Sequence, residues 1–301
     1  MISANKIIFT SFYILLLLTS CSKEPANTTP DIMDTVVSFN VSSPLDNQLK
    51  EISGLELDNN GRYWGNNDHG NPNVLFGFNT NGILEKEIQL NGVDNTDWED
   101  LAMDKNDNLY IGDFGNNDND RNDLNIYIIP EFSSLTTSTV VPQIIHFNLE
   151  DQDQFPPPNN QKHFDLESFF AFNDTLYLFS KDRSTPFEGK TNMYKLPAKA
   201  GTYQAVLVTS FFTDNEKEKG EITAADISPD GNNMALLSEG QLYLFSNFEN
   251  NNFFSGKVEK FEFPVKRKYE GIVFIDDNEL AVVNEEKYNE SPQLLFISFS
   301  K

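Results

Sequence analysis

Cysteine is almost absent from this chain of 301 residues, because Cys21 is the only one. No disulfide can therefore form within the chain. Histidine is also scarce, and the three histidines do not cluster along the sequence. Since zinc sites are built mainly from cysteine and histidine side chains, the sequence speaks against a zinc site.

Basic residues are few as well. The chain has 22 lysine and arginine residues against 46 aspartate and glutamate residues, a formal net charge of −24. A field of that sign repels phosphate backbones and anionic lipid surfaces, so we expect no nucleic-acid partner. A phosphorylated small molecule would need a bound cation or a local group of basic side chains in order to bind.

Long hydrophobic runs are missing after the first twenty residues. Lys6 precedes the apolar run 7–18, which is too short to span a bilayer comfortably, and Leu18-Thr19-Ser20-Cys21 follows. This ending resembles a bacterial lipobox, in which the cysteine is lipidated and becomes the mature N-terminus. We predict a lipoprotein signal peptide at 1–20, a lipidated tether at 21–34 and a folded domain at 35–301. An ordinary signal peptide with an incidental cysteine is the alternative.

Lipidation would make the membrane a partner of this protein. Acyl chains such as palmitate on Cys21 anchor a protein durably when more than one is attached. Ser22 follows the cysteine where an aspartate could stand, which resembles lipoproteins sent on to the outer membrane. We therefore expect an outer-membrane lipoprotein of the bacterial cell envelope, facing the periplasm or the surface.

Familiar catalytic motifs are missing too. The chain has no Gly-x-Ser-x-Gly elbow, no P-loop and no Gly-x-Gly-x-x-Gly sequence. Serine-hydrolase, P-loop and dinucleotide-binding templates are therefore not supported.

Short runs rich in Val, Ile, Leu, Phe and Tyr are what the sequence does contain, separated by Asn, Asp and Gly. They group into five units of 46 to 68 residues between equivalent points. The expected first strands of these units begin at Ser53, Trp98, Asp165, Ile222 and Tyr269. Four units offer four strands and the fifth only three, so we expect 35–41 to supply the missing outer strand. The pattern predicts an all-β, five-bladed β-propeller of four-stranded antiparallel blades, closed by its N-terminal strand.

Clusters of Asp, Asn and Gly lie between the first and second strands of each unit. Two-residue hairpins favour these residues, so we interpret Asp58-Asn59-Asn60-Gly61 and Asp230-Gly231 as turns. Calcium-binding loops are the rival interpretation, although the residues lack the EF-hand spacing. Two further stretches, 116–123 and 151–162, are predicted to be insertions at the rim.

Each unit begins with a polar residue at an equivalent point. Aligning the starts places the five residues in one register: Ser53, Glu99, Glu167, Thr223 and Glu270. Glu51 and Glu221 stand two residues earlier, on the same side of their strands, and are the alternatives in those two units. Three converging carboxylates repel one another unless a cation neutralises them, and calcium accepts carboxylate and hydroxyl oxygens. We predict a calcium site formed by these five residues, hereafter the ring. The alternative is that each Glu bonds backbone N–H groups where the blades meet.

Further polar residues follow the second strands and are expected beside the ring, because antiparallel neighbours place the end of one strand by the start of the next. These predicted mouth residues, as ligand-binding candidates, are Asp68, His69, Asp113, Lys181, Arg183, Glu239 and Glu285.

The segments Tyr269-Glu270-Gly271-Ile272 and Trp98-Glu99, with those at Ser53 and Thr223, resemble the calcium-activated nucleotidases, or apyrases. The resemblance implies a five-bladed propeller with a calcium ion on its axis, held at the ring positions. It does not by itself imply phosphohydrolysis, because function belongs to the site and not to the fold, and the basic groups near the mouth are sparse.

The sequence therefore leaves two candidate functions open. The first, which we prefer, is a calcium-binding propeller that binds a small ligand or partner at the channel mouth without turning it over. The second is a calcium-dependent hydrolase, either a nucleotidase-like phosphohydrolase or a lactonase similar to the gluconolactonase propellers. The acidic mouth favours the first.

Overall fold

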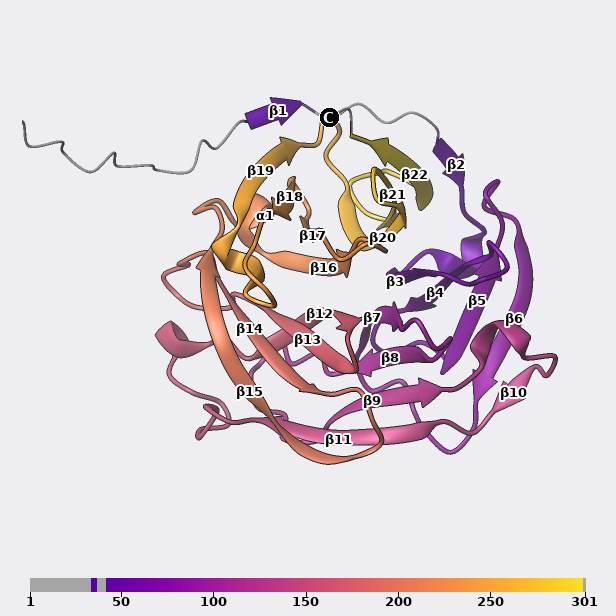
Figure 1. Cartoon of the computed structure of the whole chain (residues 1–301), viewed down its shortest axis with the longest axis horizontal. Coiled ribbons are helices and arrows are strands. Elements are labelled where there is room, and N and C mark those ends of the chain that lie inside the picture. The colour runs from indigo at the N-terminus through magenta and orange to yellow at the C-terminus, as the bar shows by residue number, and fades with distance from the viewer. Residues whose placement is uncertain (1–33, 37–41, 300–301) are drawn as a thin grey trace, which may run out of the picture. The chain divides into compact units, whose positions relative to one another are not determined.

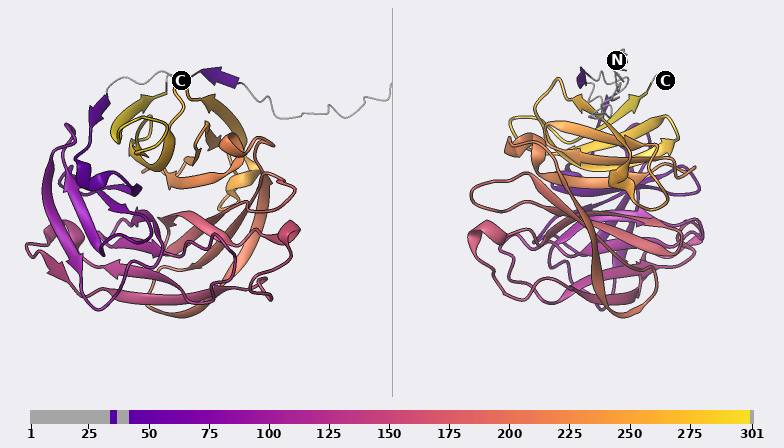
Figure 2. Two further views of the ribbon diagram at one scale, coloured as in Figure 1. Left: turned by 180° about the vertical axis from the view of Figure 1, so that it is seen from behind. Right: turned by 60° about the vertical axis from the view of Figure 1, so that its left-hand side comes forward.

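Short β-strands make up most of the computed structural model, which describes residues 34–36 and 42–299. Five of them begin successive units of the chain and lie innermost: β3 (Ile52–Leu57), β7 (Trp98–Met103), β12 (Asp165–Phe172), β16 (Ile222–Ile227) and β20 (Lys268–Asp276). Each contacts the next along the chain, and β20 contacts β3 again, so the five close into a ring of strands. Figure 1 shows them around a common centre, and Figure 2 shows the same arrangement from behind. The predicted β-propeller fold is confirmed.

The remaining strands follow outward from each first strand. In the first unit they are β4 (Tyr63–Asn67), β5 (Val74–Phe78) and β6 (Leu84–Leu90), with β10 (Thr139–Val140) added in parallel to β6. In the second they are β8 (Leu109–Asp113), β9 (Leu124–Ile129) and β11 (Gln143–Leu149). In the third they are β13 (Thr175–Lys181), β14 (Lys190–Pro197) and β15 (Gly201–Phe212). In the fourth they are β17 (Asn233–Ser238), β18 (Gln241–Ser246) and β19 (Lys257–Glu262). In the last they are β21 (Glu279–Glu285) and β22 (Gln293–Ser298).

The described strands form four sheets, because the second and third units share one. Their outer strands β11 and β15 pair in parallel, which joins the two units into an eight-stranded sheet. The sequence did not indicate this join, since pairing between outer strands leaves no local pattern.

The closing strand differs from the expected one. Predicted at 35–41, it is instead β2 (Ser42–Pro44), which pairs antiparallel with β22 of the last unit. β1 (Asp34–Val36) pairs in parallel with β19 of the fourth unit. Residues 37–41 lie outside the described residues, as do Cys21 and the predicted signal peptide.

The predicted turns are confirmed. Gly61, Asp107 and Gly231 have positive φ angles of 79°, 65° and 72°, as tight hairpins require. The carboxylate of Asp58 accepts hydrogen bonds from the backbone N–H groups of Asn60 and Arg62, at 2.8 and 2.9 Å. Asp58 therefore organises the turn between the first two strands of its unit.

Within residues 34–36 and 42–299, helical structure is limited to short pieces. They are the helix α1 (Lys217–Gly220) and the 3₁₀ turns Asn47–Leu49, Phe132–Ser134, Asn159–Gln161 and Phe253–Ser255. Among the described residues, no helix is both long and apolar enough to cross a membrane.

Apolar side chains fill the space between neighbouring sheets. Two carboxylates, the buried Asp100 and the half-buried Asp226, bind the inner strands to one another. Asp100 on β7 accepts hydrogen bonds from the backbone N–H groups of Phe169 and Ala225, at 3.2 and 3.4 Å. Asp226 on β16 accepts one from Phe274 on β20, at 2.7 Å. Glu56 on β3 is buried beside Asp226. Backbone bonding where units meet, which we considered for the ring, is thus performed by these neighbouring residues.

Candidate functional site

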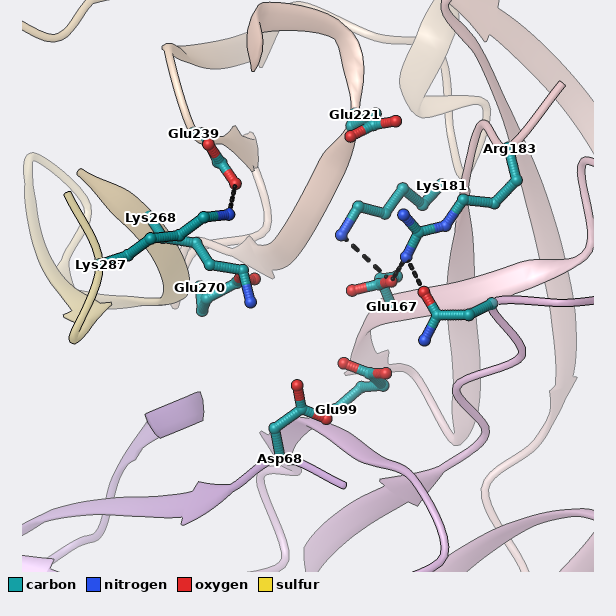
Figure 3. Close-up of a pocket in the computed structure, with 11 residues that line it drawn as sticks. Asp68, Glu99, Glu167, Lys181, Arg183, Glu221, Glu239, Lys268, Glu270 and Lys287 are labelled. Carbon is teal, nitrogen blue, oxygen red and sulfur yellow. Dashed lines mark hydrogen bonds and ion pairs between the residues drawn. The ribbon is translucent and has the colours of Figure 1, made fainter. Parts of the chain in front are cut away.

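A cavity of about 240 Å³ opens where the inner strands begin. Figure 3 shows the residues that line it. They are Asp68, Glu99, Asn117, Glu167, Lys181, Arg183, Glu221, Glu239, Lys268, Glu270 and Lys287. All are polar, and six of them are carboxylates. The cavity therefore suits a cation or a small polar molecule better than an apolar one.

The five ring residues share one backbone feature, a β-bulge at the start of each first strand. The pairing register shifts between Leu166 and Ser168, on either side of Glu167. The same shift surrounds Ser53, Glu99, Thr223 and Glu270 in the other four units. A bulge takes a residue out of the ladder and turns its side chain aside. The five positions are therefore structurally equivalent, as the alignment of the starts predicts.

Equivalence of position does not bring all five side chains to the cavity. Glu99, Glu167 and Glu270 line it. The Ser53 hydroxyl donates a hydrogen bond to Oε2 of Glu99 at 3.4 Å, and so helps to hold that carboxylate in place. The Thr223 hydroxyl donates to the backbone oxygen of Tyr269 at 2.8 Å.

The predicted mouth residues divide in the same way. Asp68, Lys181, Arg183 and Glu239 line the cavity. His69, Asp113 and Glu285 are not among the lining residues, and each has another partner. The ring nitrogen Nδ1 of His69 lies 2.7 Å from the Thr96 oxygen, while Asp113 accepts from the Tyr127 hydroxyl at 2.6 Å. Glu285 pairs with Lys268 at 2.9 Å.

Two basic side chains neutralise Glu167. The Lys181 Nζ lies 3.1 Å and the Arg183 Nη2 lies 2.9 Å from Oε1 of Glu167. Burial by itself would raise the pKa of Glu167, but Lys181 and Arg183 outweigh it and lower that pKa to about 2. Glu167 is therefore a carboxylate with its counter-charges already present.

Lys268 serves Glu270 in the same manner. Its Nζ lies 2.7 Å from Oε1 of Glu270 and 2.9 Å from Oε1 of Glu285, bridging two carboxylates. Burial nevertheless raises the pKa of Glu270 to about 7, against the opposing effect of Lys268. Lys287 pairs with Glu239 at 3.2 Å. We did not predict Lys268 or Lys287 from the sequence.

Glu99 lies beside two further carboxylates and not beside basic side chains that pair with it. Asp68, Asp97 and Glu99, hereafter the acidic corner, each offer a carboxylate oxygen within 4.8 Å of the others. Among the described residues no lysine or arginine forms an ion pair with them, and His69 Nδ1 is 4.0 Å from Asp97. Burial, and then Glu167, raises the pKa of Glu99 well above its ordinary value. Burial, and then Asp68, raises the pKa of Asp97 to about 6.

A sequence signal for the missed residues did exist. Asp97 and Lys268 each stand two residues before a ring carboxylate, the offset at which Glu51 and Glu221 precede Ser53 and Thr223. Side chains two apart on a strand share a face, so this second row belonged beside the ring. We weighed only Glu51 and Glu221 in this row, because they stand where the ring residue is a hydroxyl.

The chain matches no known protein family, and no curated protein matches it in sequence. Solved structures, in contrast, do match it. The fold is that of β-propeller proteins. The PQQ-bound aldose sugar dehydrogenase of Streptomyces coelicolor has a TM-score of 0.52 at 8% identity, covering 87% of this chain and 97% of that one.

Two further structures are similar at lower scores. A gluconolactonase from Xanthomonas campestris has a TM-score of 0.44 at 12% identity, over 82% of this chain and 72% of that one. Virginiamycin B lyase from Staphylococcus aureus has a TM-score of 0.41 at 14% identity, over 85% and 69%. At such identities the likeness concerns the fold alone.

Proposed function

We propose that this protein binds a divalent cation, calcium, together with a small polar ligand or partner group in the cavity at the mouth of the propeller. The charge of the lining supports this proposal. Six carboxylates face four basic side chains there, and each basic side chain is already engaged in an ion pair with a carboxylate. The cavity therefore carries an excess of negative charge that a bound cation would relieve.

One observation carries the proposal, the buried and unneutralised carboxylate of Glu99. Only 4% of this residue is exposed, and within the described part of the chain its carboxylate accepts a single hydrogen bond, from Ser53 at 3.4 Å. Burying a carboxylate without a partner is costly, and its neighbours Asp68 and Asp97 add repulsion. Carboxylate and hydroxyl oxygens are the ligands that calcium prefers. The resemblance of the ring segments to the apyrases supports the same ion.

Binding without turnover agrees best with the engaged basic groups. A phosphohydrolase must neutralise charge that develops on the phosphoryl group, and Lys181 and Arg183 are already directed at Glu167 (Figure 3). A calcium-dependent hydrolase, nucleotidase-like or lactonase, is the second candidate. Lys268 and Lys287 favour it, because they bring two more basic groups to the lining than the sequence indicated.

A screen separates the two. The purified protein with calcium is incubated with nucleoside diphosphates, aryl phosphates and lactones, and both binding and product are measured. The proposal expects binding without product, while turnover that Glu167→Gln abolishes would make the protein a hydrolase.

We also propose that the domain is held in the cell envelope by acyl chains on Cys21, as an outer-membrane lipoprotein. The lipobox-like sequence before Cys21 and the polar segment after it support this. Labelled palmitate should be incorporated into the wild-type protein and not into Cys21→Ser. Equal labelling of both proteins would refute the anchor.

A further inference from the structure

Resting on the proposed function, we infer that the cation lies off the axis of the propeller, in the acidic corner of Asp68, Asp97 and Glu99. Lys181 and Lys268 then serve as built-in cations for the rest of the ring. The site is thus not the five-residue ring, of which only Glu99 remains a ligand.

The spacing of the acidic corner fits a cation. One oxygen from each of the three carboxylates lies within 4.8 Å of the other two. Asp68 follows β4, Asp97 precedes β7 and Glu99 lies on β7. Calcium binds oxygens at about 2.3–2.6 Å, so ligands on opposite sides of the ion are about 5 Å apart. A calcium ion between these oxygens needs little movement of the walls.

An orphaned oxygen points to the same place. Asp97 is 8% exposed, and its Oδ1 is buried without accepting a hydrogen bond. Such atoms are rare in folded proteins and call for an explanation, such as an ion. Among the described residues the Glu99 carboxylate accepts one hydrogen bond, of 3.4 Å from Ser53, whereas Oδ1 of Asp68 accepts one of 2.5 Å from the backbone N–H of His69.

Gly115 leaves the space beside these carboxylates open. A Cβ atom on this residue would lie 2.2 Å from Oε1 of Glu99 and 2.5 Å from Oδ2 of Asp97. Any side chain there would push the two carboxylates away. A glycine is therefore needed for Asp97 and Glu99 to converge as they do.

The axial position is less suitable. A cation between Glu167 and Glu270 would meet the amino groups of Lys181 and Lys268, which lie 3.1 and 2.7 Å from those carboxylates. Like charges repel strongly in a buried site. The Thr223 hydroxyl, expected as a ring ligand, is engaged with the Tyr269 backbone oxygen at 2.8 Å. The basic side chains thus neutralise Glu167 and Glu270, as a bound cation would neutralise the acidic corner.

Calorimetric titration with calcium tests the location. Glu99→Gln and Glu270→Gln make the same chemical change at equivalent bulges, so each controls for the other. We expect Glu99→Gln and Asp97→Asn to weaken calcium binding by about tenfold or more, and Glu270→Gln to change it by less than about threefold. Melting without calcium checks folding, and neither corner variant should melt lower than the wild type, because each removes a repelling charge.

The outcomes separate this inference from the function. Loss of calcium binding in Glu270→Gln but not in Asp97→Asn would place the ion on the axis, which overturns the inference and keeps the function. Absence of calcium binding to the wild-type protein would overturn both. Gly115→Ala, which leaves every carboxylate in the chain, should weaken calcium as the corner variants do, and unchanged affinity would also contradict the inference.

Discussion

Carboxylates at equivalent backbone positions have different fates in this molecule, because their neighbours differ. Glu167, Glu270 and Glu99 all leave their strands at the same kind of bulge and are all buried. Glu167 and Glu270 meet lysine or arginine side chains, and Glu99 meets two aspartates. Repetition in the sequence therefore predicts where the side chains lie, but not which of them needs an ion.

Lys268 is the residue whose removal should cost the most stability at the mouth. Lys268→Met leaves Glu270 and Glu285 without their shared partner, and breaking a mostly buried pair costs about 3 kcal/mol. Urea unfolding at pH 7.5 measures this loss. The double variant Lys268→Met/Glu270→Gln should recover part of it, because the stranded charge is removed. A single variant as stable as the wild type would contradict the assigned role.

The second row of charged residues shows how much of the site the sequence holds. The two-residue offset before each ring position contains Glu51, Asp97, Asp165, Glu221 and Lys268. The strand period places each beside its ring residue. Which of them reaches the cavity depends on its partners: Asp165, for example, is engaged at 2.5 Å by Arg183, which follows the neighbouring strand β13. The strand pattern places such residues near one another but does not show which ion pairs they form.

At the scale of elements, the first strands were predicted closely. Trp98, Asp165 and Ile222 begin strands as expected, and the other two begin one residue earlier than predicted, at Ile52 and Lys268. Hydrophobic periodicity and turn residues locate such strands well. The bounds of the closing strand were predicted wrongly, and the pairing of β11 with β15 was not predicted, because both depend on contacts between distant parts of the chain.

The carboxylates that bind inner strands together make stability depend on pH. Burial raises the pKa of Asp226 to about 7, so the folded state holds a proton that the unfolded state releases near pH 4. The destabilisation of the folded state that comes from ionising Asp226 is absent below about pH 4, grows as the pH rises from there and is complete above about pH 7. Between pH 5 and 8 the wild type should therefore lose stability relative to Asp226→Asn, by an amount on the order of a few kcal/mol.

Two comparisons test this prediction. Unfolding free energies of both proteins are measured across that range, so that all other titrating groups cancel. Burial, and then Asp226, raise the pKa of Glu56, so Glu56→Gln should reduce the slope as well. A difference between wild type and Asp226→Asn that does not vary with pH would refute the explanation. Asp226→Ala, which removes the acceptor of the Phe274 N–H, should be less stable than Asp226→Asn by about 1–3 kcal/mol.

At the scale of the whole molecule, fold and chemistry separate. A β-propeller fold does not by itself assign a reaction, because one fold can carry unrelated chemistries, so function must be argued from the site. Here the site is a polar cavity at one end of the inner strands, in a chain with a net charge of −24. Both features favour a cation as the first ligand.

Thermal unfolding with and without calcium tests whether the folded protein binds calcium. An ion that binds only the folded state at 100 times its dissociation constant stabilises it by about 2.7 kcal/mol. For a domain of this size we expect the Tm to rise by about 5–10 °C. We predict that rise for the wild-type protein at pH 7.5, and its loss in Glu99→Gln. A Tm of the wild-type protein that does not change with millimolar calcium would contradict calcium binding.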